Sequence, residues 1–142
     1  MSAKQLSVFI ENRQGRLVEV LQVLKDGGIS ILSMSLADTT EYGLLRLIVN
    51  DPESCKEKLS AAGFSTLLSN VLVVKIAHQS GSLQDLLKLL SDANIGIEYM
   101  YGLSIESDEA YVVLKASDVN KIDAILNENR IKTISCEELG KI

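Results

Sequence analysis

The chain has 142 residues, of which 46% are hydrophobic and 23% charged, and its formal net charge is −5. This is the composition of an ordinary globular protein, and an acidic chain without a long run of one charge argues against a nucleic-acid surface. With no apolar run near the roughly 18 residues of a membrane span and no charged leader before an apolar stretch, we expect a cytoplasmic protein that binds no membrane.

One sequence unit occurs twice in the chain. Gly15 returns as Gly81, which is 66 positions later (81 − 15 = 66), and after the second strand the offset becomes 67, because Asp51 returns as Asp118. A repeat of this kind indicates two related structural units. We therefore expect two domains, residues 1–69 and 70–142.

The first half alternates between strand and helix patterns. Apolar residues at every second position favour strands, and spacings of three and four favour helices. The pair Gly27–Gly28 is expected to end the first helix in the left-handed conformation, and Asp51–Pro52 to begin the second. The predicted elements are a strand at Gln5–Glu11, a helix from Leu17, strands at Ile29–Ala37 and Leu44–Val49, a helix ending at Gly63, and a strand at Phe64–Leu68.

The second half repeats this order after a predicted turn at Ser69–Asn70. Its elements are strands at Val71–Ala77 and Ile95–Ser104, an acidic turn at Glu106–Glu109, strands at Ala110–Ala116 and Ile131–Cys136, and helices at Ser82–Asp92 and Val119–Asn127. Each half is then βαββαβ, which closes most simply as an antiparallel sheet with both helices on one face. The predicted fold class is α+β, with two ferredoxin-like units.

The second strand carries apolar residues of both parities. Ile29 and Ile31 alternate with Leu32, Met34 and Leu36, so both faces of this strand would be apolar. If one face meets the helices, the other needs a cover, and we expect it to be a second copy of the chain in a homodimer. The alternative is an exposed, moderately apolar sheet face.

The sequence shows no signature of catalysis, metal binding or a cofactor. His78 is the single histidine, and Cys55 and Cys136 lack ligand spacing, so they are expected to be free thiols. Nucleotide and hydrolase motifs are missing as well. The topology is shared with RNA-recognition modules, but the central strands lack the aromatic run that stacks bases. We expect a protein that is not an enzyme and binds no nucleic acid.

The two glycine loops are the best candidate sites. A loop that leads from a strand into a helix leaves backbone N–H groups unpaired at the positive end of the helix dipole, where a carboxylate binds well. Gly15 or Gly81 lets a ligand approach the main chain, and Asn12 or His78 can add a hydrogen bond. The alternative is that both glycines only permit tight turns.

Asn12-Arg13-Gln14-Gly15-Arg16-Leu17, the Gly-Gly or Asn break before Ile-x-Ile, and the βαββαβ order together resemble the ACT domain, in tandem over nearly the whole chain. This resemblance implies a regulatory module that binds a free amino acid between paired domains and controls enzymes or transcription factors of amino-acid metabolism. With no catalytic or DNA-binding domain in the sequence, we expect regulation in trans, for example of an enzyme, or storage of the ligand. The alternative is a scaffold without a ligand.

The resemblance also implies that the second strands of the two halves lie side by side in one eight-stranded sheet. The residues expected around the ligand are Asn12, Gln14, Gly15, Arg16, Leu17, Ile29, Ser30, His78, Ser80, Gly81, Ser82, Leu83, Ile95 and Gly96.

Overall fold

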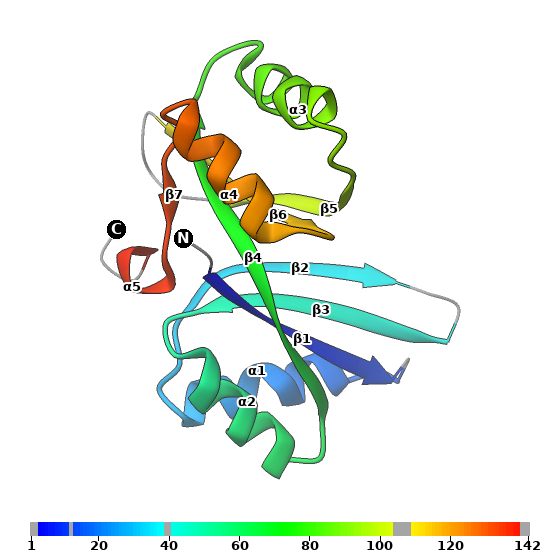
Figure 1. The fold of residues 1–142 in the computed structure, drawn as a ribbon. Helices are drawn as coiled ribbons and strands as arrows, with labels where there is room; N and C mark the ends of the chain where they lie inside the picture. Colours follow the sequence, from blue (N-terminus) through cyan, green and yellow to red (C-terminus); the bar gives the residue numbers. More distant parts are fainter. Residues whose placement is uncertain (1–2, 12, 39–40, 104–108, 140–142) are drawn as a thin grey trace. The chain divides into compact units, whose positions relative to one another are not determined.

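A computed structural model describes residues 3–11, 13–38, 41–103 and 109–139 of the chain (Figure 1). Along the sequence the elements are β1 (Ala3–Glu11), α1 (Arg16–Asp26), β2 (Ile31–Asp38), β3 (Tyr42–Val49), α2 (Pro52–Ala61), β4 (Ser65–Ala77), α3 (Ser82–Asp92), β5 (Ile97–Leu103), β6 (Glu109–Ala116), α4 (Val119–Glu128), β7 (Thr133–Ile134) and α5 (Cys136–Leu139). The predicted α+β class and the βαββαβ order are confirmed.

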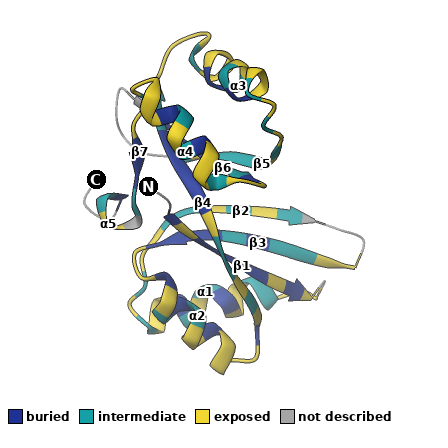
Figure 2. Ribbon diagram, in the orientation of Figure 1, coloured by how far each residue is buried: buried dark blue, intermediate teal, exposed yellow. Residues whose placement is uncertain are grey.

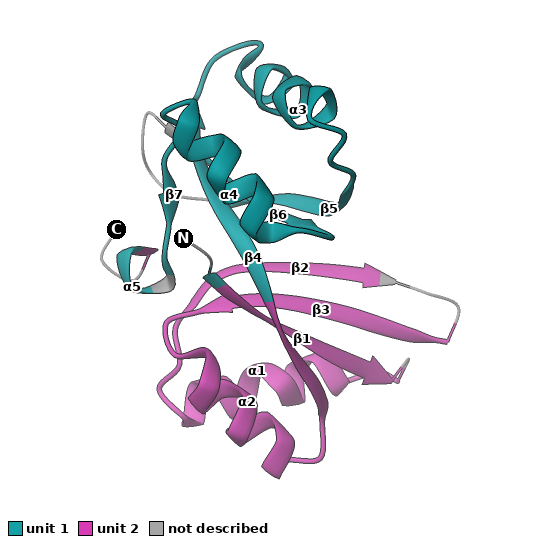
Figure 3. Cartoon of the chain, viewed as in Figure 1, with its two compact units in different colours: residues 1–3, 70–138, 142 teal, residues 4–69, 139–141 magenta. Residues whose placement is uncertain are grey.

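The chain packs into two compact units (Figure 3). The N-terminal unit, shown as unit 2, contains residues 4–69 and Leu139, and the C-terminal unit, shown as unit 1, contains Ala3 and residues 70–138. In the N-terminal unit the strand order is β2-β3-β1-β4. Its core lies between the strands and helices α1 and α2, and its buried members include Leu6, Val8, Val20, Leu24, Leu45, Leu47, Cys55 and Leu59.

The C-terminal unit repeats this architecture with its own core. Its strands follow the order β7-β4-β6-β5, and its core joins them to helices α3 and α4 through residues such as Leu72, Val74, Leu86, Leu90, Leu114, Ile122 and Leu126. Figure 2 shows buried and exposed residues alternating around α1 to α4, as expected for helices that pack on one side only.

The predicted turn between the halves is wrong. Ser69 and Asn70 lie inside β4, a single strand of 13 residues that runs from one unit into the other. The chain therefore has seven strands in its described part rather than eight. The strand order ends on β2 and on β5, so the expected pairing of these two strands with one another is not made among the described residues. Neither glycine nor proline stands at Ser69–Asn70 to break the strand.

The second strand is not apolar on both faces, because it contains a bulge. Its register against β3 shifts between Ile31 and Ser33, which makes Leu32 an extra residue. Beyond the bulge Met34 and Leu36 stand opposite the core residues Leu47 and Leu45, and Ile31 stands opposite Val49. Paired residues of an antiparallel ladder share a face, so Ile31, Met34 and Leu36 all lie on the helix side.

Three further differences concern the ends of elements. Gly27 has φ −85°, so only Gly28, at φ 67°, is left-handed after α1, and Asn94 takes its place after α3 at φ 60°. The last predicted strand is only β7, and the short helix α5 follows where Cys136 was expected to end a strand. Most of the predicted acidic turn at Glu106–Glu109 lies outside the described residues.

Cutting the chain between residues 69 and 70 divides β4, so the fragments 1–69 and 70–142 should each be less stable than the intact chain. Each fragment loses the continuation of a strand on which its own sheet is built. Urea unfolding followed by circular dichroism measures this as lower transition midpoints. Two fragments that each unfold at the midpoint of the whole chain would show that the halves are independent.

Candidate functional site: the glycine loops

Both glycine loops enter their helices through the same backbone conformation. Gly15 precedes α1 with φ 89° and ψ −11°, and Gly81 precedes α3 with φ 90° and ψ −14°. The first N–H of each helix donates to a loop carbonyl at 3.3 Å. Among the described residues no side chain caps either helix, so the N–H groups that follow in the first turn are left for solvent or a ligand. The predicted uncapped, positively polarised helix start is therefore present in both units.

The hydrogen bonds of the two loops also correspond. After β1 the N–H of Arg13 donates to the carbonyl of Glu11 at 2.7 Å, and after β4 the N–H of Gln79 donates to the carbonyl of Ala77 at 2.9 Å. The N–H of Glu19 donates to the Gly15 carbonyl at 3.1 Å. Because the backbone of the loops is the same, any difference in binding between them must come from side chains.

A cavity of about 360 Å³ opens at the first loop. Its lining joins the end of β1, the loop, the start of α1 and the β2–β3 hairpin, through Ile10, Glu11, Arg13, Gly15, Leu17, Leu36, Ala37 and Gly43. Its size is at the lower end of the range of ligand pockets. The cavity has apolar walls and, at its charged positions, one carboxylate and one guanidinium, which is the complement of a small zwitterion.

Of the predicted residues, Gly15 and Leu17 line this cavity, whereas Gln14 is exposed and Arg16 points elsewhere. The guanidinium of Arg16 lies 4.0 Å from the ring centroid of Phe64 and 2.6 Å from a carboxylate oxygen of Glu19. Its side chain is only 14% exposed, and it reaches a Glu11 oxygen at 3.8 Å. The hydrogen bond from Arg16 holds the pKa of Glu19 below its ordinary value. Arg16 is thus a packing residue of the N-terminal unit.

The second loop lies open to solvent. His78, Ser80, Gly81 and Leu83 are exposed, and Ser82 is half-buried at the start of α3. Ser82 lines a separate cavity of the C-terminal unit, on the side of α3 that faces β4. The contact predicted for His78 stays a prediction.

The remaining predicted residues lie away from the loop of their own unit. Ile29 and Ser30 follow the C-terminal end of α1, a helix of 11 residues and so about 16 Å long. There the N–H of Ser30 donates to the side-chain oxygen of Asn50 at 3.0 Å. Ile95 and Gly96 follow α3 in the same way. Asn12 lies outside the described residues.

Sequence reasoning missed the contribution of the β2–β3 hairpin. Gly43 stands opposite Ile10 in the β1–β3 ladder, and Leu36 stands opposite Leu45 in the β2–β3 ladder. The hairpin thereby places Leu36 and Gly43 beside the end of β1. The signal was available in part, because the βαββαβ order predicts that the third strand pairs with the first.

The described residues do not offer a cluster of catalytic or metal-binding groups. Cys55 is fully buried in the core, and burial raises the pKa of its thiol to about 11, so the thiol stays protonated and unreactive near neutral pH. No group of three or more His, Cys, Asp and Glu side chains in this part of the chain could hold a metal ion. Likewise, none of the helices described is long and apolar enough to cross a membrane.

The two βαββαβ units with glycine-led helix starts agree with the fold that the sequence resemblance implied. The sequence profile of the ACT domain pair matches residues 1–142, and the chain belongs to this family. An ACT domain pair is a regulatory module rather than a catalytic one, and a regulatory, small-molecule-binding role fits this chain. A sequence search among curated proteins finds no match.

Solved structures with the same fold agree with this assignment. Protein BT0572 from Bacteroides thetaiotaomicron is 33% identical, with a TM-score of 0.94 over 100% of this chain and 98% of that one. The ligand-free regulatory subunit of aspartate kinase from Thermus thermophilus is 14% identical, with a TM-score of 0.64 over 88% and 90%. The corresponding subunit from Thermus flavus is 15% identical, with a TM-score of 0.64 over 89% and 90%.

Replacing Gly15 by alanine should destabilise the protein by about 1–2 kcal/mol, because a side chain is strained in the left-handed region. A Cβ at this position would meet no atom within 4 Å, so backbone strain is the only cause. Gly96→Ala is the matched control, since that glycine has equal space and no positive φ. Urea unfolding measures both variants. Equal stability of the two would contradict a conformational role for Gly15.

Proposed function

We propose that this ACT domain pair senses a free amino acid at the Gly15 loop and regulates an enzyme of amino-acid metabolism in trans, in the cytoplasm. The observation that carries the proposal is the cavity beside the uncapped start of α1. A free amino acid has two opposite charges on neighbouring atoms and a small side chain. The lining of this cavity offers a counterpart to each of the three.

Each part of the ligand is assigned to a group of the cavity. The α-carboxylate binds the N–H groups of the first turn of α1 and the guanidinium of Arg13. The α-ammonium binds the carboxylate of Glu11, and the side chain packs on Leu17 and Leu36. A ligand of so few atoms has a binding free energy of about −4 to −8 kcal/mol, which corresponds to millimolar to micromolar affinity.

Action in trans is supported by the description of two similar structures. The Thermus subunits are regulatory subunits of a kinase by their description, which is the kind of arrangement proposed for this chain. The further expectation that a neighbouring half completes the ligand pocket, and that His78 and Ile95–Gly96 take part, stays a prediction.

A thermal-shift screen of the free amino acids tests the proposal, since a ligand at 100 times its Kd adds about 2.7 kcal/mol of stability. Glu11→Gln should then weaken the binding of the active amino acid about tenfold, because it removes the partner of the ammonium. Glu57→Gln, on the exposed side of α2, is the matched control and should bind normally.

Calorimetry on the three proteins gives the affinities. A screen in which no amino acid raises the unfolding temperature would contradict the proposed function. An amino acid that binds Glu11→Gln and the unaltered protein equally would keep the sensing role and overturn the assigned site.

A second candidate function is assembly, and the edge strand β2 favours it. Its helix-side residues Ile31, Met34 and Leu36 are 38%, 43% and 54% exposed. β2 is also an end strand of the order, with a ladder to β3 alone among the described strands. An apolar edge of this kind pairs readily with another copy. We propose that the chain forms a homodimer through this edge.

Met34→Lys should shift the protein from dimer to monomer, because a charge at an edge strand opposes pairing with a second copy. Met34 does not line the cavity at the Gly15 loop, so amino-acid binding reports whether the loop is intact. Multi-angle light scattering at tens of micromolar measures the mass. An unaltered protein that is monomeric, or a variant that stays dimeric, would contradict an interface at β2.

A further inference from the structure

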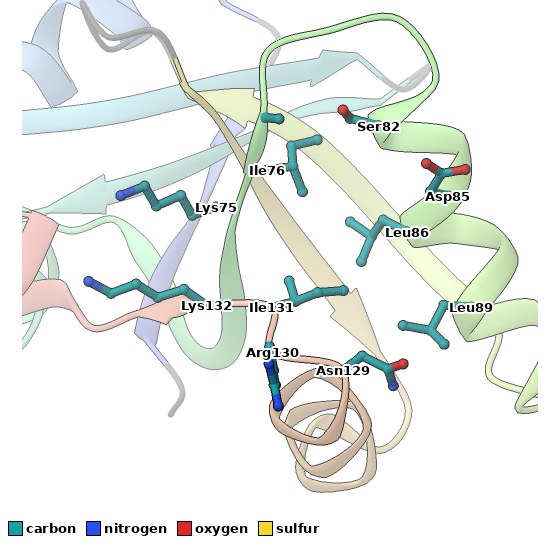
Figure 4. Close-up of a pocket in the computed structure, with 11 residues that line it drawn as sticks. Lys75, Ile76, Ser82, Asp85, Leu86, Leu89, Asn129, Arg130, Ile131 and Lys132 are labelled. Atoms are coloured by element: carbon teal, nitrogen blue, oxygen red, sulfur yellow. The ribbon is translucent and has the colours of Figure 1, made fainter.

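A cavity of about 880 Å³ lies in the C-terminal unit. It is bounded by α3 on one side and by β4 with the chain after α4 on the other (Figure 4). The apolar side chains of Ile76, Leu86, Leu89 and Ile131 point into it (Figure 4). Its polar rim on α3 is formed by Ser82 and Asp85.

The same place in the N-terminal unit is occupied by the protein itself. By the offsets of the repeat, Ser82 corresponds to Arg16, Asp85 to Glu19 and Ile131 to Phe64. Arg16 fills the space there, with its guanidinium over the Phe64 ring at 4.0 Å and at 2.6 Å from Glu19. The remaining cavity, which includes Ile10, Arg16, Gly63 and Ser65, measures about 350 Å³. The C-terminal unit has one of the two acids, Asp85 in place of Glu19, whereas Ala77 stands in place of Glu11 and Ser82 in place of the arginine.

The positively charged side chains on β4 and the segment beside it lead away from α3, and the acidic side chain of Asp85 lies on the opposite side (Figure 4). Lys75 and Ile76 are neighbours in one strand, as are Ile131 and Lys132 in the segment beside it, and neighbouring residues point to opposite faces. Figure 4 shows both lysine side chains leading away from α3, while Ser82 and Asp85 lie on the side of the isoleucines. Arg130, fixed at φ 59°, lies at the other end of the cavity, along α4 (Figure 4).

We propose that this cavity binds a small molecule that carries a guanidinium or ammonium group on an aliphatic stem. The cation takes the place of the missing Arg16 group, with the carboxylate of Asp85 as its partner and the Ser82 hydroxyl as an acceptor. The stem packs between Leu86 and Leu89 on α3 and Ile76 and Ile131 opposite. The ligand must carry its positive charge at one end only, because Arg130 at the far end of the cavity (Figure 4) repels a second cation.

This site is distinct from the Gly15 loop and does not rest on the sensing role proposed there. It belongs to the other unit and is lined by none of the residues of the first cavity. A failure of one assignment therefore leaves the other standing. Glu11→Gln, which alters the loop site, should leave binding at this cavity unchanged.

The test is a titration of the full-length ¹⁵N-labelled protein with n-butylguanidinium chloride, followed by NMR. We expect the amide signals of Leu86, Leu89 and Ile131 to shift, with smaller shifts for 1-pentanol and none for valerate. L-Arginine and an acetylated, amidated Gly-Arg-Gly peptide are titrated in parallel. Shifts with free arginine that exceed those with the peptide support a small molecule, and the reverse overturns it in favour of an arginine side chain of a partner.

Two variants of the C-terminal unit decide the site. Ser82→Arg restores the residue of the other copy and should abolish the shifts by filling the cavity. Asp85→Asn, an exposed and structurally mild change, should weaken butylguanidinium binding about tenfold by removing its charged partner. Unchanged affinity in both variants, or a stronger response to valerate than to butylguanidinium, would overturn the proposal.

The reciprocal change provides a control in the N-terminal unit. Arg16→Ser should open there the space that the C-terminal unit already has, since Glu19 then loses the guanidinium at 2.6 Å. Butylguanidinium should produce new shifts at Val20, the counterpart of Leu86, only in this variant. Their absence in a folded Arg16→Ser protein would show that the missing arginine is not what creates the site.

Discussion

The left-handed backbone of Gly15 and Gly81 is the constraint on which the entry into the first helix of each unit depends. Only glycine adopts φ near 90° without strain, and this conformation turns the chain from strand to helix within a few residues. Because the glycine itself stands at the cap position, it brings no side chain to close the first N–H groups. The positive end of each helix therefore stays open, whatever the neighbouring side chains are.

On this shared backbone the two copies have diverged in their side chains. The first loop brings Glu11 and Arg13 to its cavity, where the second has Ala77 and Gln79. The opposite charges of the first pair are consistent with a site for a zwitterion. The second pair carries no charge. The two copies thus share a loop geometry and differ in charge at a few positions.

Arg16 shows why one copy is filled and the other hollow. Its side chain is nearly buried, and its Nε has no hydrogen-bond partner among the described residues, which costs about 1–3 kcal/mol for a buried donor. The ion pairs with Glu19 and Glu11 and the contact with Phe64 offset this penalty. In the C-terminal unit Ser82 stands in place of Arg16, so no buried guanidinium is left without a partner. The space that Arg16 fills in the other unit remains open there.

Much of the fold could be predicted, because local signals and the repeat agreed. The helix caps are an example: Asp51 accepts from the N–H of Ser54 at 3.1 Å, and Asp118 accepts from the N–H of Lys121 at 3.0 Å. The continuity of β4 and the bulge at Leu32 could not be predicted, since both depend on pairing with distant strands rather than on local pattern. The prediction of two apolar faces assumed strict alternation along the second strand. The bulge interrupts this alternation, so Ile31 lies on the same face as Met34 and Leu36.

The residues of the candidate site also fall into two groups, those that a local sequence pattern indicates and those that depend on pairing with distant strands. Gly15 and Leu17, which line the cavity, could be predicted because a glycine before an apolar helix is a local signal, whereas Leu36 and Gly43 reach the cavity only through the ladders of β3. Arg16 was assigned to the ligand from its place in the loop motif. Its direction is decided by Phe64, 48 positions later (64 − 16 = 48), and such a partner is invisible to a reading of local sequence.

The two copies differ in the ion pairs that link the loop to the helix, because only the first has a carboxylate at the position of Glu11. In the N-terminal unit it lines the loop cavity and also lies 3.8 Å from Arg16, so it belongs to the loop side and the helix side at once. A ligand ammonium that draws on the Glu11 carboxylate must weaken its attraction for Arg16, which then depends more on Glu19. Ala77 removes this link in the C-terminal unit. A ligand at the first loop would therefore affect the packing of its own helix through Glu11, and the second loop has no carboxylate at the corresponding position.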